Sequence, residues 1–206
     1  MAKFLGIDVS TYQGIIDWDA VKASGIEFAI LRCGYGDDTV SQDDDTFHRN
    51  AQECSRINLP FGVYIFSYAN TWENIKSEVQ HTLRMINGYN LSYPVVLDLE
   101  DNNTSGSLDA DTLGAFADYW CTEIKNAGYY PMIYASKNWF RNYLTDSRFN
   151  KWDKWVACYY YNDERDNNVD ANDYANTEYK MWQYSSHGNV NGINARVDMN
   201  YCYVDD

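Results

Sequence analysis

The stretch Tyr93–Asp101, which reads YPVVLDLED, decides the fold because a short apolar strand carries acidic residues at its C-terminal end. Side chains alternate along a strand, so Asp98 and Glu100 point to the same face, with Cα atoms about 6.6 Å apart. In a β/α barrel that face is the interior, and catalytic groups gather where the strands end. Repulsion between two such carboxylates raises the pKa of one of them, which places an acid beside a base.

The rest of the chain repeats this pattern, with apolar runs separated by segments of helical period. We expect strands at 4–9, 28–33, 61–68, 95–99, 130–134, 155–160, 179–185 and 196–203. We expect helices at 17–23, 45–57, 71–86 and 109–127, with a shorter helical piece at 136–144. An Asp or Thr suited to N-capping opens each of the first four helices, and Gly25, Gly88 and Gly128 stand where helices would stop. Five β-α units followed by three strands predict an α/β fold, a single TIM-like barrel over residues 1–206.

Composition narrows the classes of partner. Aromatic residues make up 17% of the chain, and the many Tyr and Trp rings suit a sugar-binding cleft. The formal net charge of -14 repels phosphates and anionic lipid, so we expect neither nucleic acid nor membrane as a partner. No apolar run approaches the length of a membrane span. A monomer is the expected state.

Neither the cysteines nor the histidines show the spacing of a metal site, so we expect no metal and no cofactor. The five cysteines are scattered and odd in number, which favours buried free thiols over the alternative of a disulfide framework. The polar stretch 162–176 is rich in Asp and Asn and suggests calcium. It lacks the central Gly and terminal Glu of an EF-hand, so a solvated loop is the preferred interpretation.

Two further acids stand near strand ends, Asp8 within GIDVS and Asp198 within ARVDMN. If the barrel closes, the last strand lies beside the first and brings Asp198 near Asp8. Each acid also has a plain structural explanation: Asp8 can cap a helix, Asp198 can pair with Arg196, and acids after a strand can simply face solvent. Four acids converging from three strands favour a functional site.

Several motifs, in this order along the chain, resemble those of glycoside hydrolase family 25 lysozymes. They are DVSTYQG at 8–14, IDW at 16–18, FAILR at 28–32, VLDLE at 96–100, WQY at 182–184 and VD at 197–198. The resemblance covers essentially the whole chain. It implies a barrel of five β-α units plus three strands. It also implies hydrolysis, with retention, of the β-1,4 bond between N-acetylmuramic acid and N-acetylglucosamine in bacterial peptidoglycan.

The resemblance also implies roles for individual residues. Glu100 matches the family's proton donor, and Asp98 is the candidate for the opposing carboxylate. Asp98 either attacks the sugar or orients the substrate's acetamido group to attack in its place, and the sequence leaves both open. Asp8 and Asp198 carry over as further active-site acids. The candidate substrate-binding residues are Tyr68, Tyr134, Trp182 and Gln183, and a place in the core is about equally compatible with each of the three aromatics.

Rival functions remain at this stage. A non-catalytic carbohydrate-binding domain uses aromatics and acids without cleaving, and a barrel glycosidase acting on chitin-like glycans needs the same acids. A metal-dependent amidase or deacetylase ranks last because no ligand set is visible. The start of the sequence, MAKFLGIDVS, shows no signal peptide. Action outside the cell on the wall would therefore need lysis, a holin, another route or a leader missing from this sequence.

Overall fold

The computed structural model describes residues 2–159 and 178–204, and within them eight strands form one closed barrel. The strands follow the chain in order: β1 (Ala2–Val9), β2 (Phe28–Tyr35), β3 (Phe61–Phe66), β4 (Val95–Asp98), β5 (Pro131–Ser136), β6 (Asp153–Ala157), β7 (Met181–Gly188) and β8 (Val197–Val204). Strands β1 to β7 pair in parallel with their neighbours, and β8 closes the barrel antiparallel to both β7 and β1. The expected TIM-like barrel is confirmed.

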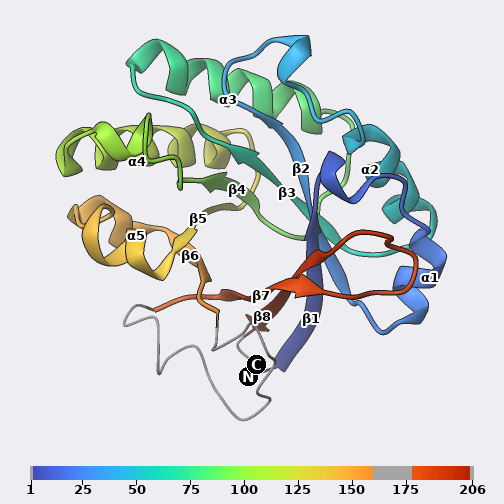
Figure 1. The fold of residues 1–206 in the computed structure, drawn as a ribbon. Coiled ribbons are helices and arrows are strands. Elements are labelled where there is room, and N and C mark those ends of the chain that lie inside the picture. The colour runs from blue at the N-terminus through green and yellow to red at the C-terminus, as the bar shows by residue number, and fades with distance from the viewer. Residues whose placement is uncertain (1, 160–177, 205–206) are drawn as a thin grey trace.

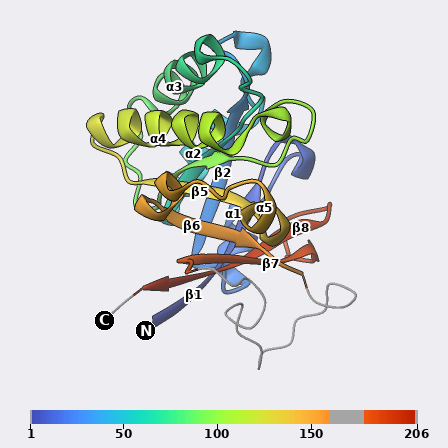
Figure 2. The same cartoon turned by 90° about the vertical axis from the view of Figure 1, so that its left-hand side faces the viewer.

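The helices lie around the strands, with α2 to α5 beside β2 to β5 and α1 beside β1 (Figure 1; Figure 2). Their bounds are α1 (Trp18–Ala23), α2 (Phe47–Arg56), α3 (Trp72–Ile86), α4 (Ala110–Asn126) and α5 (Lys137–Asn142). Short 3-10 turns occur at η1 (Thr11–Gln13), η2 (Val40–Gln42), η3 (Ser105–Ser107) and η4 (Ser147–Lys151). The order of five β-α units and then three strands matches the prediction.

The expected N-caps hold for three of the first four helices. The side chains of Asp17, Thr71 and Asp109 each accept a hydrogen bond from a backbone N–H in the first turn of α1, α3 and α4. The cap expected at the start of the 45–57 segment is wrong, because α2 begins at Phe47 and Thr46 occupies its N-cap without a side-chain bond. The carboxylate of Asp44 instead accepts bonds from the amide and the hydroxyl of Thr46.

The ends of three helices follow the glycine pattern. Gly25, Gly88 and Gly128 have φ values of 87°, 87° and 92°, a backbone region that residues with a Cβ rarely adopt. These glycines turn the chain back toward the next strand, as expected from the sequence.

Strand alternation sorts the buried side chains into two layers. In β4, Val96 belongs to the cluster inside the barrel, whereas Val95 and Leu97 pack against the helices. The interior cluster takes residues of the same phase from the other strands, including Phe28 and Ile30 of β2. The next residue in this phase of β4 is Asp98, so the fold alone directs that carboxyl group into the barrel.

The reversed direction of β8 decides where Asp198 lies. In an all-parallel barrel, the first residues of a strand sit at the end opposite the catalytic rim. Because β8 runs antiparallel to β1, Asp198 near its start pairs in register with Asp8 near the end of β1. Both acids therefore stand at the same rim.

The remaining expectations concern the cysteines, the membrane and the acidic stretch. All five cysteines are free thiols, and Cys33, Cys54, Cys121 and Cys202 are buried. Among the helices of the described residues, none combines the length and apolarity needed to cross a bilayer. The stretch 162–176, interpreted above as a solvated loop, lies outside the described residues.

Candidate active site

A pocket of about 180 Å³ opens at the rim where β1 to β5 end and β8 begins. All four predicted acids line it: Asp8, Asp98, Glu100 and Asp198. Its other walls are aromatic and polar side chains from β2, β3, β5, β6 and β7 and from the turn after β1. The structure thus brings together in one pocket the acids that the sequence places on three separate strands.

Asp8 lies at the base of the pocket in a dense hydrogen-bond network. Its Oδ2 accepts from Asn200 Nδ2 at 2.7 Å and from Gln183 Nε2 at 2.9 Å, and Asp198 Oδ2 lies 3.4 Å from the same Nε2. Burial raises the pKa of Asp8 to about 6, although hydrogen bonds with Asn200, Gln183 and Asp198 act in the opposite direction. Asp8 therefore exchanges its proton at mildly acidic pH.

Asp98 is buried and differs from Asp8 in having an unsatisfied oxygen. Its side chain is 3% exposed, and Oδ1 has no hydrogen-bond partner within the described residues. Burial raises the pKa of Asp98 well above its usual value, and the charges of Glu100 and Asp8 raise it further. A buried acceptor without a partner is costly, and a donor on a bound molecule would relieve that cost.

Glu100 follows β4 by two residues and has an exposed side chain at the mouth of the pocket. The pocket walls still displace enough water to raise the pKa of Glu100, and the charges of Asp198 and Asp101 add to that rise. A carboxyl group that is accessible and holds its proton above the usual pH suits a general acid.

The predicted substrate-binding residues divide into three groups. Tyr134 and Gln183 line the pocket, and the Tyr134 hydroxyl donates to Gln183 Oε1 at 2.8 Å. Tyr68 is 41% exposed beside the pocket but does not line it. Trp182 lies outside the pocket, because its side chain faces away from the barrel interior, packs against Tyr184 and Tyr201 and donates to the Cys158 carbonyl.

Sequence reasoning gave no role to Arg32, Asn200 or Trp155, which the structure places in or beneath the pocket. Arg32 lines the pocket. Trp155 lines it too and donates to Asn200, which in turn donates to Asp8. The alternation of side chains along a strand could have identified two of them. Arg32 follows Phe28 and Ile30 at intervals of two, and Asn200 follows Asp198 by two, so both face the barrel interior.

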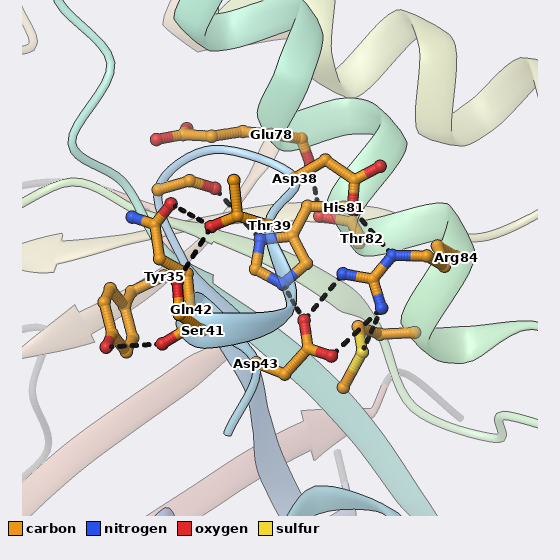
Figure 3. Close-up of polar contacts among 12 residues, drawn as sticks. Tyr35, Asp38, Thr39, Ser41, Gln42, Asp43, Glu78, His81, Thr82 and Arg84 are labelled. Carbon is orange, nitrogen blue, oxygen red and sulfur yellow. Dashed lines mark hydrogen bonds and ion pairs between the residues drawn. The ribbon is translucent and has the colours of Figure 1, made fainter. Parts of the chain in front are cut away.

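A second polar network outside the pocket supports its rim from helix α3. Glu78 is fully buried, and its carboxylate accepts from the Ser67 hydroxyl at 2.7 Å and from the Tyr68 amide at 2.8 Å. Burial raises the pKa of Glu78 to about 7, although these hydrogen bonds lower it. One turn further along, His81 contacts the loop after β2 (Figure 3).

Within the described residues, no group of three or more His, Cys, Asp or Glu side chains has the arrangement of a metal site.

A closed β/α barrel with four carboxyl groups in one aromatic-walled pocket has the carboxyl pair that glycoside hydrolases use. The chain belongs to the family described as Glycosyl hydrolases family 25, whose profile matches residues 7–193. It is 31% identical over 201 residues to the uncharacterized protein YegX of Escherichia coli, an alignment that covers 95% of this chain and 68% of YegX. It is 29% identical over 196 residues to the autolytic lysozyme of Clostridium acetobutylicum, with coverage of 94% and 54%.

Among solved structures, the modular autolysin LytC of Streptococcus pneumoniae superposes with a TM-score of 0.80 at 27% identity. The match covers 98% of this chain and 47% of LytC, and LytC has also been solved in complex with a synthetic peptidoglycan ligand. The chain therefore spans about half the length of LytC and of the clostridial lysozyme. The family and these lysozymes support a peptidoglycan-hydrolysing enzyme of lysozyme type.

Proposed function

We propose that residues 1–206 form a single catalytic domain that hydrolyses the β-1,4 bond between N-acetylmuramic acid and N-acetylglucosamine in bacterial peptidoglycan, with retention at the anomeric carbon. The observation that carries this proposal is the pocket lined jointly by Asp8, Asp98, Glu100 and Asp198. Glycoside hydrolysis needs a proton donor and an opposing carboxylate, and this pocket offers both.

Glu100 is the proposed general acid. Its raised pKa keeps the proton bound to a higher pH than in an ordinary glutamate, and its accessible position suits delivery of that proton to the leaving oxygen. Donation of the proton leaves a carboxylate that activates water in the second step.

Asp98 is the proposed opposing carboxylate. Its orphan Oδ1 fits either of two steps: direct attack on the anomeric carbon, or acceptance of the acetamido N–H so that the acetamido oxygen attacks. Asp8 and Asp198 are the proposed further acids of the pocket, which influence the protonation of its other carboxyl groups. Gln183 lies between them and donates to Asp8. Tyr134, whose hydroxyl orients the Gln183 amide, contributes an apolar ring to the wall.

The lysozyme relatives support peptidoglycan as the partner, and LytC has been solved with a synthetic peptidoglycan ligand. We propose that the enzyme acts as a monomer on the wall, outside the cytoplasm.

The test is incubation of purified peptidoglycan with the protein, followed by assay of reducing ends and of free amines. We expect reducing ends at muramic acid and no new amines, with the β-anomer formed first in a proton NMR time course. Release of amines without reducing ends would identify an amidase. A protein that binds peptidoglycan and releases neither would be a carbohydrate-binding domain.

A further inference from the structure

Arg32 stands out as a cation inside an acidic pocket. It lies in β2 in the phase that faces the barrel interior, and it lines the pocket together with the four acids. Its side chain is only 11% exposed, so most of the guanidinium has left bulk water. Burying a charge in this way is costly, and the side chain must be held by its surroundings.

One edge of the guanidinium is fixed by Asp44. Arg32 Nε donates to Asp44 Oδ2 at 2.8 Å, and the carboxylate of Asp44 is fully buried. The same oxygen accepts the Thr11 amide at 2.9 Å, and the other oxygen accepts the amide and hydroxyl of Thr46. These contacts come from separate segments, so Asp44 is held firmly and holds Arg32 in turn.

Helix α3 anchors the loop that carries Asp44. The neighbouring residue, Asp43, lies between His81 and Arg84 of α3 (Figure 3), with distances of 2.9 Å to His81 Nε2 and 2.6 Å to Arg84 Nη2. The other His81 nitrogen lies 3.0 Å from the Gly36 carbonyl oxygen. This anchoring limits how far Asp44, and with it Arg32, can move when a ligand enters.

The other edge of the guanidinium is available. Tyr12 and Tyr35 flank the group, with ring centroids 5.2 Å and 5.8 Å from its central carbon. Within the described residues, the Arg32 side chain makes its hydrogen bond to Asp44 through Nε, and neither Nη atom donates one. The two Nη atoms carry four N–H donors on a side chain that lines the pocket, and among the described residues Arg32 forms no ion pair with the four pocket acids.

We propose that Arg32 is a specificity-determining residue that binds the oxygen atoms of the 3-O-lactyl substituent of the muramic sugar. This inference rests on the proposed function and names the group that separates muramic acid from glucosamine. The lactyl group offers a carbonyl oxygen where it bears a peptide and a carboxylate where it does not. A fixed guanidinium fork recognises both, and the fork binds a carboxylate through two parallel bonds. Chitin has no lactyl group to fill this position.

The test compares binding of two peptide-free tetrasaccharides. One alternates N-acetylmuramic acid and N-acetylglucosamine and carries a lactyl carboxylate on each muramic sugar, and the other contains N-acetylglucosamine alone and is uncharged. Both are titrated calorimetrically into Glu100→Gln protein, so no hydrolysis is needed. We expect Arg32→Met in that background to weaken binding of the muramic tetrasaccharide about tenfold or more. Binding of the glucosamine tetrasaccharide should change less than about twofold.

Controls separate recognition from general effects. Arg56→Met removes one exposed cation that, among the described residues, pairs with Asp19 and Glu53, and it should change neither affinity. Arg32→Met combined with Asp44→Asn removes both partners of the buried pair, which provides a folded variant if the single change leaves Asp44 too destabilising. Arg32→Lys keeps the charge without the fork and should recover only part of the lost affinity.

Equal weakening of both ligands by Arg32→Met, or no weakening of either, would overturn the proposal, because Arg32 would then serve only to offset the pocket's acids. Failure of the proposed function would appear differently, as wild-type protein that releases no reducing ends from peptidoglycan.

Discussion

At the scale of single residues, Asp98 and Glu100 show how one short segment produces two kinds of carboxyl group. Asp98 is buried with an oxygen that has no partner, whereas Glu100 reaches the pocket mouth. Both pKa values are raised, but only Glu100 can exchange its proton readily with solvent. This difference in access supports the proposed roles of Glu100 in proton transfer and of Asp98 in contact with the sugar.

The first residue-scale prediction concerns Glu100→Gln. The amide keeps the shape of the side chain and cannot donate a carboxylic proton, so turnover of peptidoglycan should fall at least about 10²-fold. Because the side chain is exposed, the thermal midpoint should stay within a few degrees of wild type. Circular dichroism and reducing-end assays on the same preparation check both statements, and a fully active, folded variant would refute the role.

The second prediction concerns Glu78 and pH. Its pKa rises from 4.5 to about 7 on folding, so between these values the folded protein holds a proton that the unfolded chain has released. Stability contributed by this group is present below pH 4.5 and is lost as pH rises through 7, at about 1.4 kcal/mol per unit. Glu78→Gln should flatten this part of the pH dependence, as measured by urea unfolding between those limits.

The groups with lowered pKa values act in a separate window. Asp146 has its pKa lowered to about 2 by Arg148, so its contribution is present above its unfolded value and is lost only as pH falls toward 2. An unchanged slope in the Glu78→Gln variant between pH 4.5 and 7 would show that Glu78 does not hold its proton on folding.

At the scale of elements, helix α3 acts as the outer support of the pocket rim. Along one face it contacts the loop after β3 through Glu78 and the loop after β2 through His81 and Arg84. The end of β2 approaches α3 closely because Gly34 has no side chain: a Cβ there would lie 2.5 Å from the His81 ring. Support of the rim therefore depends on buried contacts more than on surface charge.

The third prediction compares His81→Ala with Arg84→Met. His81 is completely buried, so its removal leaves a cavity and an unpaired Gly36 carbonyl, and should lower the free energy of unfolding by about 2–4 kcal/mol. Arg84 is 39% exposed in its side chain, and its loss should cost about 1 kcal/mol or less. Chemical denaturation of both variants measures the two losses of unfolding free energy. A larger loss for Arg84→Met than for His81→Ala would contradict the prediction.

The elements themselves were predictable from the sequence to a large degree. The periodic spacing of apolar residues predicts the strands and helices, and residues such as Asp109 and Gly128 mark where a helix begins and ends. Both signals depend only on nearby sequence. The N-cap predicted before α2 was wrong because Asp44 binds residues both nearby and far away in the sequence. Asp44 bonds Thr46, but its other oxygen is committed to Arg32 and Thr11, and no local pattern reveals those partners.

The candidate site was predictable only in part, because its remaining members depend on closure of the barrel. Asp98 and Glu100 could be paired by strand phase alone. The approach of Asp198 to Asp8 required the last strand to lie beside the first, and its antiparallel direction was not foreseen. Strict use of strand alternation would have removed Trp182 from the predicted site, because its neighbour Gln183 faces the interior. The same rule would have added Arg32 to the site.

At the scale of the whole molecule, the charge of -14 shapes the encounter with a polyanionic wall. Repulsion between like charges slows association, and salt shortens its range from about 30 Å at 0.01 M to about 8 Å at 0.15 M.

The fourth prediction is that the initial rate on intact walls rises at least about twofold over this range of salt concentration. The rate on a short soluble muramic oligosaccharide, which carries only a few charges, should change much less, and turbidity and reducing-end assays measure the two. A wall rate that falls with salt would point to a cationic surface that dominates the encounter.

The pairing of β8 with β1 also has a consequence for synthesis. Asn200, which donates a hydrogen bond to Asp8, lies 192 residues further along the chain, and Asp198 pairs in register with Asp8 from the same late strand. In a nascent chain, Asp8 therefore lacks its neighbours Asn200 and Asp198 until β8 has been made. We expect a product that stops before residue 198 to be inert, because its pocket would lack Asp198.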